Sequence, residues 1–149
     1  MIITIEVPSS LTPQRVWQRL TDWPAHGNWI PLTRMIILNG EPGKPALGDS
    51  FIGRTGIGAL HFDDRMTVTQ FREPEPSRPT DTGFCEVTKS GRLIKGRAWF
   101  EVIPAEAGTK LIWVEEIKLP KAVDAVFGPL LKVIGARVFE TSLAKALAN

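Results

Sequence analysis

The sequence is poor in the residues that build disulfides and structural metal sites. It contains one cysteine, Cys85, and two histidines among its 149 residues. A single thiol excludes an intramolecular disulfide, and one thiol with two imidazoles is too few for a structural zinc site. We therefore expect no metal and no cofactor, and a reducing compartment, the cytoplasm, suits the chain best.

Long hydrophobic runs are also absent. The N-terminus enters an alternating segment, residues 2–7, without a basic leader or a cleavable apolar core. The densest apolar stretch, residues 122–134, is interrupted by Asp124, Gly128, Pro129 and Lys132. A membrane-spanning helix needs about 20 predominantly apolar residues, and a signal peptide needs the leader. We expect neither export nor integral membrane association.

Neither sign of charge is in large excess. Eighteen basic and sixteen acidic residues give a formal net charge of +2, and the basic residues are scattered along the sequence. Nucleic-acid binding depends on gathered basic residues, so we expect no nucleic-acid partner. Tyrosine is absent, whereas five tryptophans and seven phenylalanines are present. Large rings with few polar atoms suit a roomy apolar interior. The composition leaves the oligomeric state open.

The order of predicted elements is strand, helix, strands, helix. Residues 2–7 form a first strand, and a helix follows with Ser10 or Thr12 as its cap and Pro13 in its first turn. The breaker-rich segment 22–31 predicts a turn or a very short helix. Alternation and Gly- or Pro-bearing turns predict six more strands at 34–39, 50–55, 60–71, 84–90, 92–103 and 110–119. No repeat or linker divides the chain, so we expect one domain, 1–149.

The tail is predicted to be helical. Gly128-Pro129 marks a break or kink, because Pro129 has no backbone N–H to donate, so the main helix is predicted at about 129–147. Two apolar stripes run along it, and such a helix is expected to be largely enclosed. These elements together predict an α+β helix-grip fold, a curved antiparallel seven-stranded sheet wrapped around a long C-terminal helix.

Several local motifs, in this order, carry a resemblance to a known superfamily. They are Val16-Trp17, then Asp22, Pro24, Trp29 and Pro31, then Gly48-Asp49 before a strand, and Gly108-Thr109 leading into Leu111-Ile112-Trp113. Over its whole length the chain resembles the helix-grip superfamily of START lipid-transfer domains, birch-pollen-type allergens and polyketide cyclase/dehydrase-like (SRPBCC-type) proteins. The resemblance implies a cavity between sheet and helix for apolar or amphipathic molecules. It implies no catalytic set.

Two acidic residues are expected on the inner face of the sheet. Alternation places Asp64 with Phe62 and Met66, and Glu115 with Trp113. Burying an unpaired carboxylate costs several kcal/mol, so each needs a partner, a water or a proton. Each carboxylate could anchor a ligand hydroxyl or amine, or act as an acid or base with a raised pKa. The alternatives are a pair with Arg54, Arg65 or another guanidinium, or a bulge that turns the carboxylate outward.

Other residues carry similar alternatives. His26 could donate a hydrogen bond or shuttle protons at the pocket mouth, or it could be a surface residue that fixes the turn. Trp29 and Trp113 could stack on a flat ligand or fill the core. Cys85 fits a small buried apolar group better than a reactive thiol. The candidate ligand-binding residues are Trp29, Phe62, Asp64, Met66, Cys85, Phe100, Trp113, Glu115, Phe127, Leu131 and Ile134.

Three functions remain open at this stage. The first is the binding of a small hydrophobic molecule of lipid, isoprenoid or aromatic polyketide type. The second is a polyketide cyclase or dehydratase in which Asp64, Glu115 or His26 moves protons. The third is an interaction domain that acts through the loop 73–83 or a dimer surface. A cavity below about 300 Å³ would favour this last function.

Overall fold

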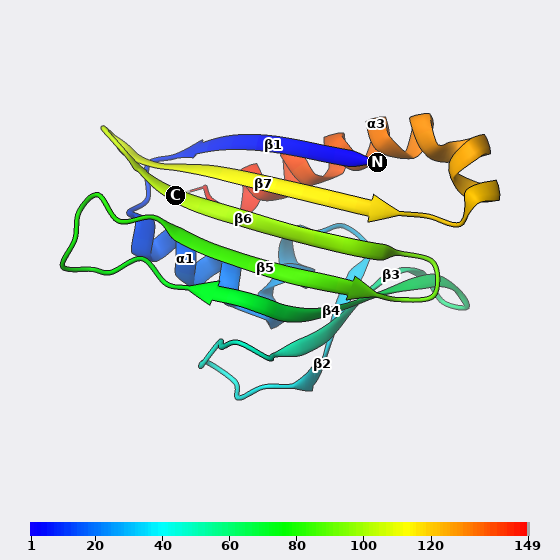
Figure 1. Cartoon of the computed structure of the whole chain (residues 1–149), viewed down its shortest axis with the longest axis horizontal. Helices are drawn as coiled ribbons and strands as arrows, with labels where there is room; N and C mark the ends of the chain where they lie inside the picture. Colours follow the sequence, from blue (N-terminus) through cyan, green and yellow to red (C-terminus); the bar gives the residue numbers. More distant parts are fainter. Residues whose placement is uncertain (149) are drawn as a thin grey trace.

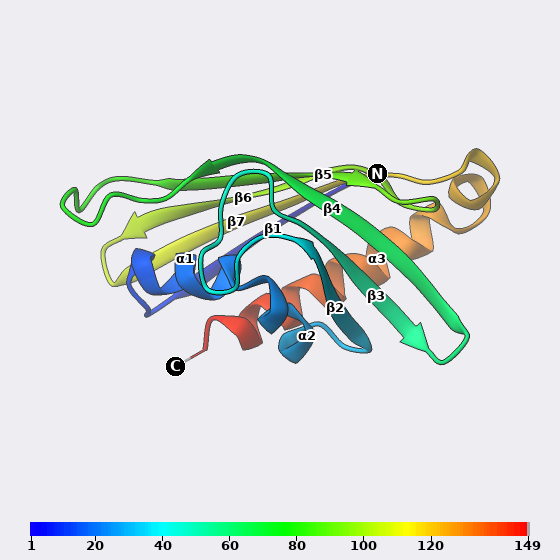
Figure 2. The ribbon, with the colours of Figure 1, turned by 90° about the horizontal axis from the view of Figure 1, so that it is seen from below.

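A computed structural model describes residues 1–148 and shows one curved sheet with the helices on its concave side (Figures 1 and 2). The elements are β1 (Ile2–Ser9), α1 (Pro13–Thr21), η1 (Trp23–Ala25), α2 (His26–Trp29), β2 (Thr33–Asn39), β3 (Ser50–Ile57), β4 (Leu60–Arg72), β5 (Gly83–Ser90), β6 (Lys95–Ala105), β7 (Gly108–Lys118) and α3 (Lys121–Ala146). The antiparallel order β1-β7-β6-β5-β4-β3-β2 confirms the predicted helix-grip fold.

The strands keep one apolar face because alternate side chains point to the same side of the sheet. The β3–β4 hairpin depends on Gly56, whose φ is +141°, and where a Cβ would overlap the Leu60 carbonyl oxygen. In β4 the register shifts between Val68 and Gln70, which is a β-bulge. The bulge lets both Val68 and Phe71 face the interior although they are three residues apart.

The first helix begins where its sequence signals predicted. Thr12 accepts a hydrogen bond from the Arg15 backbone N–H at 3.3 Å and is therefore the N-cap. The ring of Trp17 packs edge-on against Phe71 and Phe100, with centroids 5.2 and 5.5 Å away. These contacts close one end of the space between sheet and helices.

The breaker-rich segment after α1 forms η1 and α2, as predicted. It is held by the buried carboxylate of Asp49, which accepts hydrogen bonds from Trp23 Nε1 and the Ala46 N–H, both at 3.0 Å. Asp49 precedes β3, so this contact fixes the short helices over the neighbouring end of the sheet.

The prediction of a break at Gly128-Pro129 is wrong. The helix α3 runs continuously from Lys121 to Ala146 with Pro129 inside it. Proline removes one i→i−4 bond, here to the Ala125 carbonyl. Ala125 and Pro129 are both exposed, so water can satisfy that carbonyl, and the helix continues.

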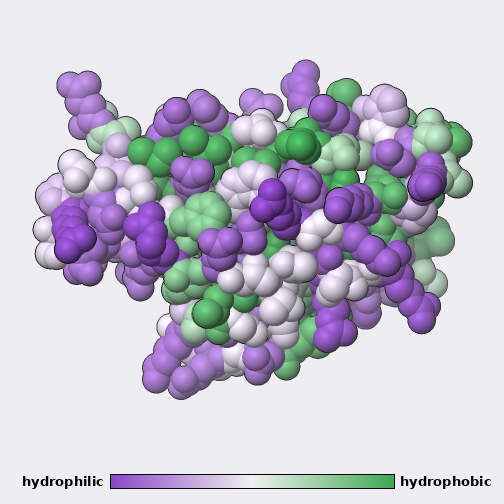
Figure 3. Space-filling view, in the orientation of Figure 1, coloured by the Kyte–Doolittle hydropathy of each residue, from purple (hydrophilic) through white to green (hydrophobic). Residues whose placement is uncertain are grey.

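The prediction that α3 is largely enclosed is also wrong for its first half. Its C-terminal part is buried at Ser142, Leu143 and Ala146, whereas Val126 is 70% exposed and Leu130 58% exposed. The first turns of α3 extend past the end of β7, where no strand covers them. Hydrophobic surface is visible at that end in Figure 3. None of the described helices is long and apolar enough to cross a membrane.

Candidate functional site

A cavity of about 420 Å³ lies between the concave face of the sheet and α3. Nine of the eleven candidate residues lie on its wall: Phe62, Asp64, Met66, Cys85, Phe100, Trp113, Glu115, Leu131 and Ile134. Trp29 and Phe127 do not. Trp29 is buried beside a separate groove between α2 and α3, and Phe127 is 52% exposed on the outside of α3.

Most of the cavity wall is apolar, and part of it is aromatic. Phe100 and Trp113 stack with their centroids 5.5 Å apart and an interplanar angle of 7°. Phe139 of α3 stacks on Trp113 at 6.1 Å. Ala98 of β6 also lines this space, and its small side chain leaves room beside the stacked rings. The volume exceeds the limit of about 300 Å³ that would have favoured a filled interaction domain.

One charged cluster interrupts this apolar wall. Lys89 of β5 places Nζ 2.5 Å from Asp64 Oδ2 and 3.2 Å from Glu115 Oε2. Trp113 Nε1 donates to Glu115 Oε1 at 2.9 Å. The side chains of Lys89 and Glu115 are each 2% exposed, and that of Asp64 is 17% exposed. Three strands therefore bring two carboxyl groups and one ammonium group together inside the protein.

The cluster contains more acceptors than donors. Asp64 Oδ1 is buried and accepts no hydrogen bond from the described residues. Glu115 Oε2 has the close ionic contact with Lys89 but no hydrogen bond of good geometry among them. Buried acceptors are normally satisfied, so these two carboxylate oxygens lack a partner that such atoms usually have.

The pKa values of two groups in the cluster, Glu115 and Lys89, lie above their ordinary values. Burial raises the pKa of Glu115, and the nearby Asp64 adds to the rise, while Lys89 and Trp113 oppose it. Burial alone would lower the pKa of Lys89, but Glu115 and Asp64 more than offset this and hold its pKa above the ordinary value. The lysine is therefore an ammonium ion at neutral pH, and Glu115 is the group most ready to take a proton.

One alternative for the inward carboxylates was a pair with a guanidinium, and the partner in the structure is instead a lysine. Arg54 lies on the outer face, where it makes two hydrogen bonds to Asp63 at 2.7 and 2.9 Å. The true partner, Lys89, was missed. The signal was present in the alternation of β5, because Lys89 shares a face with Cys85 and Val87.

His26 and Cys85 complete the wall, and neither is exposed. His26 is buried against Trp29, with Nε2 2.8 Å from the Leu20 carbonyl oxygen, so the surface interpretation was wrong. Burial lowers the pKa of His26 to about 4. Burial also raises the pKa of Cys85 to about 12, which leaves the thiol protonated and unreactive.

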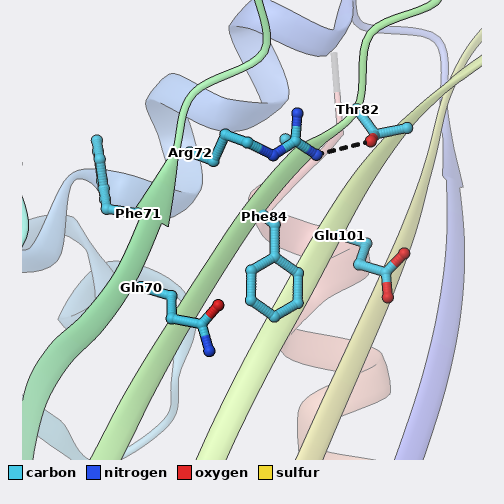
Figure 4. Close-up of a pocket in the computed structure, with 7 residues that line it drawn as sticks. Gln70, Phe71, Arg72, Thr82, Phe84 and Glu101 are labelled. Carbon is cyan, nitrogen blue, oxygen red and sulfur yellow. Dashed lines mark hydrogen bonds between the residues drawn. The ribbon is translucent and has the colours of Figure 1, made fainter.

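Besides the groove between α2 and α3, another groove lies on the opposite, outer face of the sheet (Figure 4). Its Arg72 is already engaged by Asp81 and Thr82, at 3.2 and 3.0 Å, and the groove is polar and open. Within residues 1–148, no group of three or more His, Cys, Asp or Glu side chains could hold a metal ion. The inner cavity is therefore the candidate site.

The sequence was also compared with known families. The family described as polyketide cyclase/dehydrase and lipid transport matches residues 2–149. The chain belongs to this family. No curated protein matches the sequence of this polyketide cyclase/dehydrase-like chain.

Several solved structures share the fold of this family member. A START superfamily protein from Mycobacterium smegmatis is 20% identical, with a TM-score of 0.65 over 98% of this chain and 93% of that one. The Zhui aromatase/cyclase from a Streptomyces species is 13% identical, with a TM-score of 0.59 over 98% and 86%. A norcoclaurine synthase from Thalictrum, solved with a transition-state analogue, is 11% identical, with a TM-score of 0.62 over 99% and 93%. At these identities the likeness shows the fold alone.

Proposed function

We propose that the chain binds a small hydrophobic or amphipathic molecule, of lipid, isoprenoid or aromatic polyketide type, in the cavity beneath α3. The observation that carries the proposal is an apolar cavity of about 420 Å³ with one buried charged cluster on its wall. Ligand sites have this composition, because apolar surface provides affinity and a few polar groups fix orientation. Membership of a family that includes lipid transport supports it.

The apolar wall would provide most of the affinity. Burial of apolar surface is worth about 25 cal/mol per Å², so about 200 Å² of ligand surface gives about 5 kcal/mol before the entropy of binding is subtracted. Aromatic or conjugated ligands suit this wall, because the rings of Trp113, Phe100 and Phe139 line the cavity.

The polar end of the ligand would carry a hydrogen-bond donor, a hydroxyl or an amine. Asp64 lines the cavity, and its Oδ1 has no donor from the described residues, whereas Lys89 already contacts both carboxyl groups. A donor group on the ligand would satisfy this oxygen. A ligand carboxylate would instead bring a third acid to the cluster.

A second candidate function is an acid–base reaction on a polyketide-like substrate, a cyclisation or dehydration. The observation that favours it is Glu115, whose pKa burial raises, beside an ammonium and a second carboxyl group. A buried carboxyl group with a raised pKa is a candidate proton donor or acceptor. The Zhui aromatase/cyclase, which shares the fold, supports keeping this candidate.

The first experiment is native mass spectrometry of the protein purified from its own host, followed by extraction of the bound compounds. We expect one apolar compound or a narrow class with a donor group. Recovery of the protein without any bound compound, together with no uptake of the neutral probe N-phenyl-1-naphthylamine, would contradict the proposal.

Matched variants then test the polar anchor. Asp64 lines the cavity, and Asp63, one residue away, lies on the outer face, where it pairs with Arg54. Asp63→Asn is therefore the control for Asp64→Asn, since each substitution removes one charge that is paired with a basic side chain. We expect Asp64→Asn to change ligand choice and affinity by about tenfold, equivalent to about 1.4 kcal/mol, and Asp63→Asn to change neither. For a catalyst, Glu115→Gln would instead lower the rate by about 10²–10⁴-fold, with Glu116→Gln as its control.

A further inference from the structure

The mouth of the cavity opens at one end of the molecule, the end where α3 begins. Four large apolar residues both line the cavity and are 37–48% exposed, and they mark the opening: Phe62, Leu93, Leu131 and Ile134. They come from the β3–β4 hairpin, the β5–β6 turn and α3, which lie together at the same end in Figures 1 and 2.

Exposed apolar side chains continue outward from this mouth. At the tip of the β3–β4 hairpin, Ile57 is 72% exposed and Leu60 85% exposed. On α3, exposed apolar residues lie on the outer side and beside the opening: Val126, Phe127, Leu130 and Val133. The α3 residues stand at positions i, i+1, i+4 and i+7, so they are neighbours along one side of the helix, and an exposed apolar stripe of this kind is typical of a binding surface.

An excess of positive charge lies at the same end of the molecule. The segments 57–61, 91–95 and 117–136 contain five basic residues, Arg92, Lys95, Lys118, Lys121 and Lys132, and one acidic residue, Asp124. Their net charge is therefore +4, whereas the whole chain carries +2, so the remainder carries −2. The basic residues are scattered in the sequence, but the fold brings them together. For example, Lys95 of β6 lies directly opposite Lys118 of β7 in the register of the two strands.

We propose that this end, the mouth face, docks on an anionic lipid bilayer. We define the mouth face as the β3–β4 hairpin tip, the β5–β6 turn and residues 118–134. Apolar side chains beside lysines are the composition of surfaces that lie in the headgroup region of a membrane. A second copy of the chain fits less well, because a two-fold contact would bring two faces of charge +4 together.

The docking would place the cavity mouth against the acyl chains. An apolar ligand could then move between bilayer and cavity without crossing water. The docking itself depends on the exposed residues and not on an occupied cavity, so it is tested independently of the proposed ligand binding.

The test is sedimentation with sucrose-loaded vesicles. Wild-type protein should bind vesicles of phosphatidylcholine and phosphatidylserine, roughly 7:3, at least about tenfold more strongly than pure phosphatidylcholine, and roughly 0.5 M salt should weaken the binding. Lys118→Gln with Lys121→Gln should lower partitioning about 25-fold, at about fivefold for each charge. Lys110→Gln, at the other end of the same strand, is the control and should have no effect.

The contribution of the exposed apolar side chains to vesicle binding is tested by two matched leucine substitutions. Leu130→Asp should lower partitioning at least about tenfold, because an inserted leucine is replaced by a charge. Leu47→Asp, at a leucine 64% exposed in the β2–β3 loop, should leave it unchanged. Both leucines are on the surface, so the fold should persist, which near-ultraviolet circular dichroism checks. Equal binding to both vesicle types, or Leu130→Asp binding like wild type, would overturn the proposal. The proposal would also be overturned if the protein had no affinity for vesicles and formed a dimer that Leu130→Asp dissociates.

Discussion

Replacing Lys89 with methionine tests the charged cluster most severely, because it keeps the length of the side chain and removes the one ammonium. The two carboxyl groups that contact it, at 2.5 and 3.2 Å, would then face each other across an apolar wall. Removing one partner of a buried ion pair typically costs about 3–5 kcal/mol. With a urea m-value of about 2 kcal/mol/M, the unfolding midpoint should fall by about 2 M.

The loss of folding stability in Lys89→Met should be larger at neutral pH than in acid. Burial already raises the pKa of Glu115, and the variant removes the ammonium that opposes this rise. A carboxyl group with a raised folded pKa contributes stability that is full below its unfolded pKa of about 4.3 and is lost as the pH rises through the folded pKa. The deficit of Lys89→Met should therefore be small near pH 4 and largest at about pH 7.

The assay is urea unfolding followed by tryptophan fluorescence at several pH values. Lys110→Met is the control, since Lys110 pairs with Glu6 on the surface at 3.5 Å and exposed pairs contribute about 0–1 kcal/mol. Adding Asp64→Asn to Lys89→Met should recover part of the lost stability. A deficit below about 1 kcal/mol at neutral pH, or one that does not shrink in acid, would refute the proposed burial of the cluster.

Three further outcomes follow from burial. Cys85, with its pKa raised to about 12 by burial, should not react with Ellman's reagent at about pH 8 until urea unfolds the chain; fast labelling of native protein would contradict this. Leu143→Ala should lower the free energy of unfolding by about 2–5 kcal/mol in the same urea assay, and Leu130→Ala by less than about 0.5. The neutral His26, whose pKa burial lowers to about 4, contributes stability that is full above about pH 6.5 and is lost as the pH falls toward 4. Its ring proton shifts in NMR should stay constant from about pH 8 to 5.5, and a midpoint near 6.5 would contradict its burial.

Much of the fold was predictable because period-two alternation and turn residues act locally. The inward positions of Asp64, Phe100 and Glu115 follow from alternation alone, and the structure places all three on the cavity wall. The partner of the carboxyl groups was not predictable in the same way. Lys89 reaches Asp64 because Met66 is paired with Lys89 across β4 and β5, and this register depends on where the bulge lies in β4.

The two wrong predictions about α3, its break and its enclosure, have a related cause. A helix that is apolar around most of its surface can be enclosed by the sheet, or it can extend past it, and periodicity is the same in both cases. Whether Val126 and Leu130 are covered depends on the length of β7 relative to the helix, a tertiary property. Pro129 is tolerated for the same reason, since the carbonyl it leaves free is exposed to water.

If the cavity beneath α3 is the ligand site, a side chain that fills this cavity should weaken ligand binding. Gly53 lines the cavity, and a Cβ there would make ordinary contacts, the nearest being Met66 Cε at 3.6 Å. Its neighbour Ile52 points to the outer face. We predict that Gly53→Phe weakens binding of N-phenyl-1-naphthylamine or the native ligand at least about tenfold, whereas Ile52→Phe leaves it unchanged. Wild-type affinity in folded Gly53→Phe protein would show that the ligand binds elsewhere.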